Sequence, residues 1–180
     1  MQTTRNCIST GNRRSPGTNR LTICRRPGNT EIPLMTASPN TPISGGCLCG
    51  AVRFEMTGPA HDVYHCHCSI CRKLQGALYP TYGVVARAGF RVLKGADNLR
   101  TFDSSSEVHR HFCMTCGSHV FEDTDYEPAS VWFSVGTLDD GADPGGRDGT
   151  ERHIFWESRT GWYEPADNLP KVNEFGDDNA

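Results

Sequence analysis

Seven of the nine cysteines in this 180-residue chain lie in three tight clusters, and their spacing constrains the fold more than any other feature. The clusters are Cys47-Leu48-Cys49, Cys66-His67-Cys68-Ser69-Ile70-Cys71 and Cys113-Met114-Thr115-Cys116. Thiols this close in sequence make poor structural disulfides, but a tight turn can aim two thiolates at one metal ion. Gly50 and Gly117 directly follow two of the clusters, and glycine permits the positive φ of such a turn. The pattern therefore predicts a metal-binding framework.

Two other interpretations of the cysteines stay open at this point. They could be buried free thiols, or Cys113 and Cys116 could form a redox-active pair. A disulfide framework fits poorly, because the number of cysteines is odd and no apolar stretch long enough for a secretory signal precedes them. Neither alternative accounts for three coincident clusters.

The seven thiols divide into a group of four and a group of three. A closed structural zinc takes four protein ligands, whereas a catalytic zinc takes three and leaves one position for water or substrate. The sequence thus predicts two zinc ions per chain, a structural one held by Cys47, Cys49, Cys113 and Cys116 and a catalytic one held by Cys66, Cys68 and Cys71. In an alternative partition, His65 or His67 completes the second site and closes it. The four-thiolate ion would tie the first strand to the middle of the sheet.

Glycine and proline content indicates an all-β domain built from short strands. Nineteen glycines and eleven prolines imply many turns. From Val52 to Met56, apolar and charged residues alternate as in a half-buried strand. Further strands are expected at Tyr79–Val85, Phe90–Leu93, Leu99–Phe102, Val108–Phe112, His119–Phe121, Val131–Val135 and His153–Trp156. The only predicted helix is Ser69–Gln75, with Gly76 as its C-cap.

We expect three parts along the chain: an Arg-rich disordered tail over residues 1–40, a zinc-binding domain over 41–172 and a C-terminal tail over 173–180. Residues 1–34 hold six arginines and one acidic residue and lack apolar periodicity, so they cannot build a core. They could instead be an extension upstream of a start at Met35, or an organelle transit peptide. Otherwise we expect a cytoplasmic protein.

Composition also limits the partners that we expect. The net charge of −3 is too mild to indicate nucleic-acid binding. No apolar run approaches the roughly 18 to 20 residues that span a bilayer. We therefore expect neither a nucleic acid nor a membrane as partner, and the sequence does not define an oligomeric state.

Four ordered segments resemble the glutathione-dependent formaldehyde-activating enzyme family, also called the CENP-V/GFA domain. They are Gly45–Phe54, His65–Lys73, Arg110–Gly117 and a C-terminal signature over residues 135–139 and 153–163. The resemblance implies a zinc-ribbon-like, Mss4-like all-β fold, with the four and three cysteines as structural and catalytic ligands. One departure is Thr160-Gly161, where family members often have Ala-Pro.

The implied activity is that of an S-(hydroxymethyl)glutathione synthase, a carbon–sulfur lyase type of enzyme that joins glutathione to formaldehyde. Arg72 and Arg110 are candidates to bind the glutathione carboxylates. Phe155, Trp162 and Tyr163 could wall the pocket, although we expect them to pack in the core. The alternatives are a non-catalytic zinc module that binds a protein partner or a thiol, and hydrolysis of a related thioester.

Overall fold

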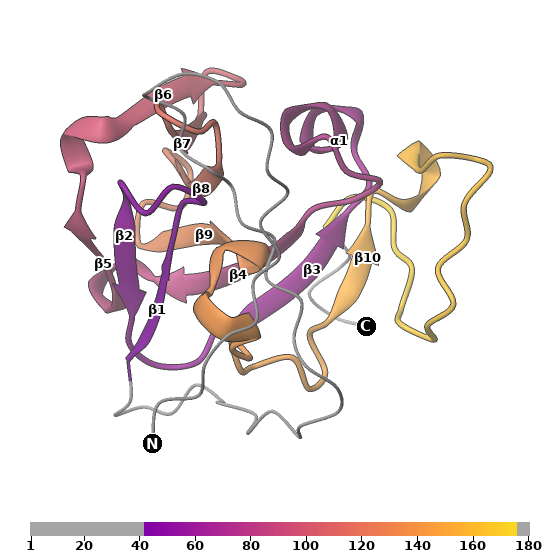
Figure 1. Ribbon diagram of the computed structural model, residues 1–180. Coiled ribbons are helices and arrows are strands. Elements are labelled where there is room, and N and C mark those ends of the chain that lie inside the picture. Colours follow the sequence, from indigo (N-terminus) through magenta and orange to yellow (C-terminus); the bar gives the residue numbers. More distant parts are fainter. Residues whose placement is uncertain (1–41, 176–180) are drawn as a thin grey trace, which may run out of the picture. The chain divides into compact units, whose positions relative to one another are not determined.

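The computed structural model describes residues 42–175, which form two β-sheets and one short α-helix (Figure 1). The strands are β1 Ile43–Gly46, β2 Arg53–Met56, β3 Asp62–Cys66, β4 Thr81–Ala86, β5 Phe90–Lys94, β6 Leu99–Asp103, β7 Val108–Cys113, β8 His119–Thr124, β9 Ser130–Ser134 and β10 Arg152–Ile154. The helix α1 is Ser69–Gln75, and short 3₁₀ turns cover Arg87–Gly89, Ala96–Asn98, Val135–Thr137, Asp139–Gly141 and Trp156–Ser158. The tail predicted for residues 1–40, with Cys7 and Cys24, lies outside the described residues.

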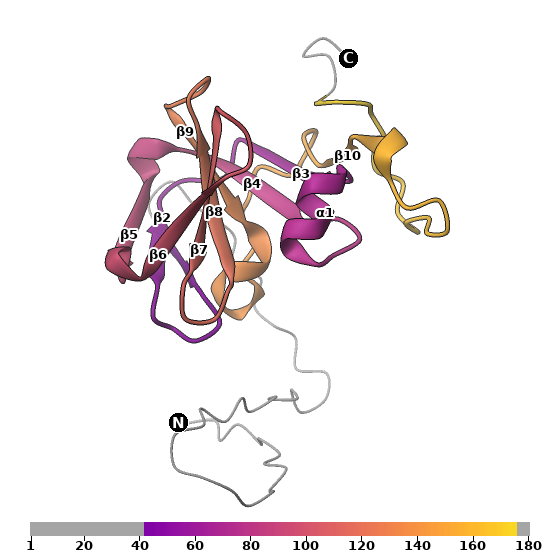
Figure 2. The ribbon, with the colours of Figure 1, turned by 90° about the horizontal axis from the view of Figure 1, so that it is seen from above.

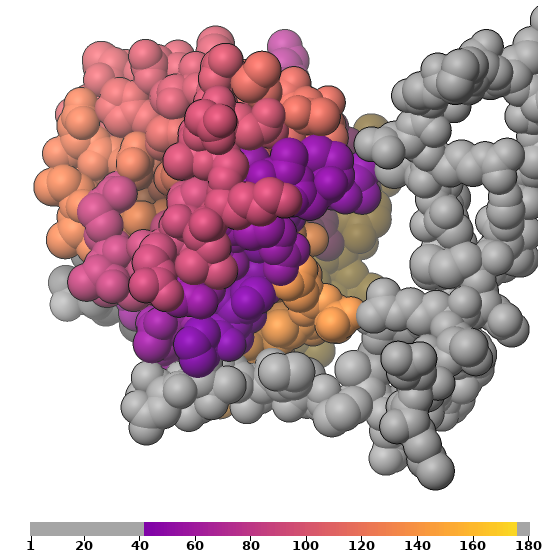
Figure 3. Space-filling model, turned by 60° about the vertical axis from the view of Figure 1, so that its left-hand side comes forward, coloured from indigo at the N-terminus to yellow at the C-terminus, as the bar shows by residue number. Residues whose placement is uncertain are grey.

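The strands form a small sheet of order β1-β2-β5 and a seven-stranded sheet of order β10-β3-β4-β9-β8-β7-β6. Pairing is antiparallel throughout these sheets except for β10, which runs parallel to β3. Figures 1 and 2 both place the small sheet on one side of the domain and α1 on the other. Figure 3 shows the small-sheet face, where the purple residues of β1 and β2 lie against the pink segment around β5.

Side-chain alternation along the central strands creates two separate apolar cores. On β4 and β9, Val85, Val131 and Phe133 belong to a core that includes Phe54 and Met56 of the small sheet. The intervening residues Tyr82, Val84 and Trp132 face the other way and pack with residues from β3, β10 and α1. Because successive strand residues point to opposite faces, one sheet serves both cores.

The predicted all-β class and the helix Ser69–Gln75 are confirmed, and Gly76 caps that helix in the left-handed conformation. Each expected strand has a counterpart whose ends differ by a few residues, although Trp156 lies in a 3₁₀ turn beyond β10. Strands β1 and β3 were not among the predicted segments. Two glycines obscure the pattern of β1, and β3 is buried on both faces, so neither shows a clear alternation.

Two expectations from the sequence need correction, one about the C-terminal end of the domain and one about where the outer cysteine pairs join the sheets. Phe175, placed in the tail, has its ring against Tyr64 and Phe155, and its carbonyl accepts hydrogen bonds from Arg152, so the folded domain continues past residue 172. Cys47 and Cys49 follow β1, whereas Cys113 ends β7, which is next to the edge strand β6, and Cys116 lies just beyond it. They therefore join the small sheet to one margin of the large sheet, not to its middle.

Replacing Gly83 by alanine should destabilise the domain by about 1–3 kcal/mol, because a Cβ at this position would overlap the ring of Phe133 on the paired strand β9. Gly136→Ala is the matched control, since nothing lies within 4 Å of a Cβ built there. Urea unfolding of both variants checks the expectation. An equal loss of stability in the two variants would contradict this account of the core.

Candidate functional site

Four cysteines converge at one end of the two sheets. The ligand atoms of Cys47, Cys49, Cys113 and Cys116 all lie within 4.8 Å of one another. The Sγ of Cys49 is 3.5 Å from that of Cys47 and 3.8 Å from that of Cys113. A tetrahedral ion with metal–sulfur bonds of about 2.3 Å needs sulfur–sulfur spacings of roughly 3.8 Å. The two spacings are close to this value, so the group could hold a metal ion.

Two similar backbone turns deliver these thiols. The amide of Gly50 donates to the carbonyl of Cys47 over 3.0 Å, and that of Gly117 donates to the carbonyl of Cys113 over 2.8 Å. The φ angle is 73° at Gly50 and 74° at Gly117. This is the left-handed region that other residues adopt at a cost, so the glycines after each cluster permit the turn.

Hydrogen-bond donors lie beside three of the four sulfurs. They come from the Val52 amide to Cys47 at 3.2 Å, the Asn98 side chain to Cys113 at 3.0 Å and the Ser118 hydroxyl beside Cys116 at 3.3 Å. Against burial, which acts to raise it, hydrogen bonds from Ser118 lower the pKa of the Cys116 thiol to about 6. Donors of this kind favour the thiolate form that binds metal.

The second group lies on the opposite face of the large sheet, between β3 and α1. Cys66 ends the strand, Cys68 is the N-cap of the helix and Cys71 lies in its first turn, with all three ligand atoms within 4.8 Å of one another. The Cys71 amide donates to the Cys68 sulfur over 3.3 Å. Hydrogen bonds from the Cys66 and Cys71 thiols lower the pKa of Cys68 to about 2. Within residues 42–175, no fourth cysteine, histidine or carboxylate joins this group.

The two histidines of the alternative partition are engaged elsewhere. His67 Nε2 lies 2.8 Å from His153 Nδ1, while His65 Nδ1 lies 2.8 Å from the Thr81 hydroxyl. His153 in turn reaches Asp167 at 3.1 Å. The result is a His67–His153–Asp167 chain that joins the cysteine loop to β10. Sequence reasoning missed this chain, although His153 stood in the C-terminal signature.

A buried polar network lies behind Cys71. The Tyr82 hydroxyl is 3.8 Å from the Cys71 sulfur and accepts hydrogen bonds from Arg110 at 3.1 Å and Gln75 at 3.0 Å. Because both of these partners donate, the single phenolic proton is left to point at the sulfur. Arg110 also pairs with the buried Glu122. Burial raises the pKa of Glu122 to about 7 even though Arg110 opposes that shift.

The structure places the two predicted arginines near the three thiols, and both guanidinium groups already make hydrogen bonds within the protein. Arg110 lines the same cavity as the three cysteines and is only 7% exposed, with its donors directed at Glu122, Tyr82 and Ser104. Arg72 donates to the carbonyls of His67 and Ser158 over 3.1 and 3.0 Å. Contact of either guanidinium with glutathione stays a prediction.

The three predicted aromatic residues have different surroundings. Phe155 lines the cavity of the thiols, and Tyr163 packs against Tyr79 at the edge of the site. Trp162 is 77% exposed, so the expectation that it packs in the core is wrong. It lies in the loop that begins at the Thr160-Gly161 departure.

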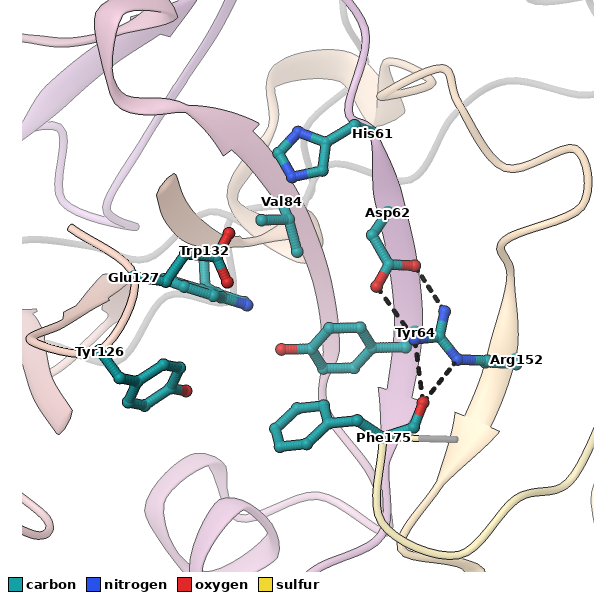
Figure 4. Close-up of a pocket in the computed structure, with 9 residues that line it drawn as sticks. All are labelled: His61, Asp62, Tyr64, Val84, Tyr126, Glu127, Trp132, Arg152 and Phe175. Carbon is teal, nitrogen blue, oxygen red and sulfur yellow. Dashed lines mark hydrogen bonds and ion pairs between the residues drawn. The ribbon is translucent and has the colours of Figure 1, made fainter. Parts of the chain in front are cut away.

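Two cavities meet at this face of the sheet. One, of about 130 Å³, is lined by Cys66, Cys68 and Cys71 together with Tyr82 and Arg110. The other, of about 290 Å³, is drawn in Figure 4. They share four aromatic residues, Tyr64, Tyr126, Trp132 and Phe175. The larger cavity therefore lies next to the thiol-lined one, with these rings in the wall of both.

Residues 42–158 match the family described as "Glutathione-dependent formaldehyde-activating enzyme". This match covers more than half of the chain, and its span contains both cysteine groups. The chain belongs to this family. In residues 42–175, no helix is long and apolar enough to cross a membrane.

Curated relatives carry the same name. Proteins of Aspergillus flavus and Podospora anserina, each named "Putative glutathione-dependent formaldehyde-activating enzyme", are 35% identical over 77 residues and 37% identical over 78 residues. Each match spans 42% of this chain, and 40% and 36% of the respective relative. The chain thus spans less than half the length of these relatives. A crystal structure of a Rhodobacter sphaeroides protein is similar at 26% identity and a TM-score of 0.49, covering 61% of this chain and 98% of that one.

The two cysteine groups should respond differently to substitution. Cys116→Ser breaks a group embedded in the core between the sheets, and a closed metal site contributes folding free energy on the order of 10 kcal/mol, so this variant should be unfolded or insoluble. Cys68→Ser changes a half-buried residue at a helix cap and should stay folded with about one metal ion per chain. Circular dichroism and elemental analysis check both, against two ions in the unchanged protein. Unfolding of both variants alike would contradict the assignment.

Tyr82→Phe should keep both ions but release the one at the three-thiol group roughly tenfold faster, because it removes one hydrogen bond to a thiolate. The control is Tyr64→Phe on the same face, whose hydroxyl makes no hydrogen bond to a cysteine among the described residues. Chelator competition measures the release. Equal rates in the two variants would mean that the Tyr82 contact has no influence on the metal.

Proposed function

We propose that this protein is a zinc enzyme that joins glutathione to formaldehyde, giving S-(hydroxymethyl)glutathione, a reaction of the carbon–sulfur lyase class run in the direction of synthesis. The observation that carries the proposal is the group of Cys66, Cys68 and Cys71 at the wall of a cavity, with no fourth ligand among the described residues. Family membership and the names of the relatives support glutathione and formaldehyde as the reactants.

Zinc is the metal that we propose for both groups, one ion in each. Sulfur-only sets of four and three thiolates suit zinc, and the two groups match closed and open sites respectively. A zinc ion held by Cys66, Cys68 and Cys71 would supply a fourth position at which the glutathione sulfur is kept as a thiolate. The four-cysteine group has no such role and stabilises the junction of the sheets.

The chain's own residues prepare the site for an anionic sulfur. Arg110 places a buried positive charge beside Cys71, and the Tyr82 proton points at the same sulfur. Both reduce the repulsion that accumulates when several thiolates share one site. Tyr64, Trp132 and Phe155 line the cavity with apolar surface and limit the water that would solvate the nucleophile.

The reaction balances without a further reactant. The glutathione sulfur, having lost its proton, forms a bond to the formaldehyde carbon, and the electron pair of the C=O bond moves to oxygen. That oxygen then takes one proton from solvent, which replaces the proton released by the thiol. Oxidation states outside the new bond do not change, so neither an oxidant nor a reductant is required.

Purified protein should accelerate the glutathione-dependent loss of formaldehyde above the uncatalysed rate, and Cys68→Ser should reduce that acceleration by at least about 100-fold. The matched control is Ser69→Ala at the exposed neighbouring position, which leaves all three thiols in place and should retain activity. A colorimetric assay of free formaldehyde is sufficient.

Two results would overturn the proposal. One is a rate equal to background in protein that carries its full metal content. The other is full activity in Cys68→Ser. A protein without activity that still binds glutathione, and whose two ions resist chelation equally, would be a non-catalytic zinc module.

A further inference from the structure

The 290 Å³ cavity beside the thiols has a distinct chemical character (Figure 4). It is far larger than formaldehyde requires, and it shares four aromatic residues with the thiol-lined cavity. The remaining groups of a molecule whose sulfur lies at the three cysteines would therefore be close to this space. The lining residues indicate which group fits there.

Among the residues that the structure describes, the cavity offers no free arginine donor. Arg152 is the only arginine or lysine among the nine lining residues. Its two terminal nitrogens donate to Asp62 over 2.5 and 3.1 Å and to the carbonyls of Thr150 and Phe175 over 2.8 and 3.1 Å, and its Nε donates to Phe175 over 3.2 Å. All five N–H groups of the guanidinium are thus engaged. A carboxylate entering the cavity would not find this cation available.

The cavity does offer a hydrogen-bond acceptor and the faces of aromatic rings. Glu127 is exposed and accepts one hydrogen bond, from the Ser130 hydroxyl at 2.5 Å, which leaves acceptor capacity on its carboxylate. Tyr64 and Trp132 are buried, while Tyr126 and Phe175 are 55% and 49% exposed at the rim. In Figure 4 the rings of Tyr64 and Phe175 lie between Glu127 on one side and Asp62 on the other. Aromatic faces together with the Glu127 carboxylate attract an organic ammonium group.

We propose that this cavity binds the ammonium end of the thiol substrate, with the ammonium between the aromatic rings and the Glu127 carboxylate. For glutathione, this is the α-ammonium of the γ-glutamyl residue. The identity of the thiol rests on the proposed function, whereas the preference for an ammonium over a carboxylate rests on the cavity alone. The carboxylate next to the ammonium is left at the solvent-facing rim, where His61 lies.

The test compares two ligands that cannot react. The metal-loaded full chain is titrated with S-methylglutathione and with its N-acetyl derivative, which lacks the positive charge, and the indole N–H resonance of Trp132 reports occupation. We expect N-acetylation to weaken binding roughly tenfold. In Glu127→Gln the difference should shrink to about threefold or less, while the control Glu107→Gln, an exposed residue outside the cavity lining, should behave as the unchanged protein.

Equal affinity for the two ligands, or no perturbation of Trp132 by either, would overturn the inference. The formaldehyde assay separates this result from the proposed function. If glutathione is turned over but the two ligands bind equally well, the proposed ammonium site is wrong and the proposed enzyme activity stands. If the two ligands bind differently but there is no turnover, the proposed activity is wrong and the ammonium site stands.

Discussion

The structure depends on bringing together thiols that repel one another once they are ionised. At the junction of the sheets, the Sγ atoms of Cys49 and Cys113 lie 3.8 Å apart across 64 residues of chain. Four thiolates at this spacing are stable only with a compensating cation, and nearby backbone and side-chain donors account for part of the balance. Cys47 and Cys113 are also core residues, so thiols that could hold a metal ion take part in the packing of the small sheet.

The alternation of the central strands then separates stability from chemistry. Val131 and Phe133 of β9 complete the core that contains the four-cysteine group, while Trp132 between them belongs to the core beside Cys66 and Cys71. A change at the three-thiol group therefore affects the face of the large sheet that is opposite the junction with the small sheet. This arrangement places the four-cysteine group in the core between the sheets and the three-thiol group at the wall of a cavity with a larger one next to it.

The parts of the site that are local in sequence could be predicted from it. Each cysteine cluster is contained within at most six consecutive residues, and the partition into four and three follows from spacing. The network around Tyr82 could not be predicted in the same way, because it needs the register of β4, β7 and β8, which brings Arg110 opposite Glu122. Likewise, the parallel pairing of β10 with β3 places His153 beside His65 in the sheet, and no local pattern encodes that contact.

Cadmium-113 NMR of protein loaded with two cadmium ions in place of zinc tests the central claim most directly, because the shift of each ion reports its sulfur ligands. The account predicts two resonances, one typical of four thiolates and one of three. Glutathione should move only the second, toward the four-thiolate position. A single type of resonance, or movement of both signals on adding glutathione, would contradict the division into a closed and an open site.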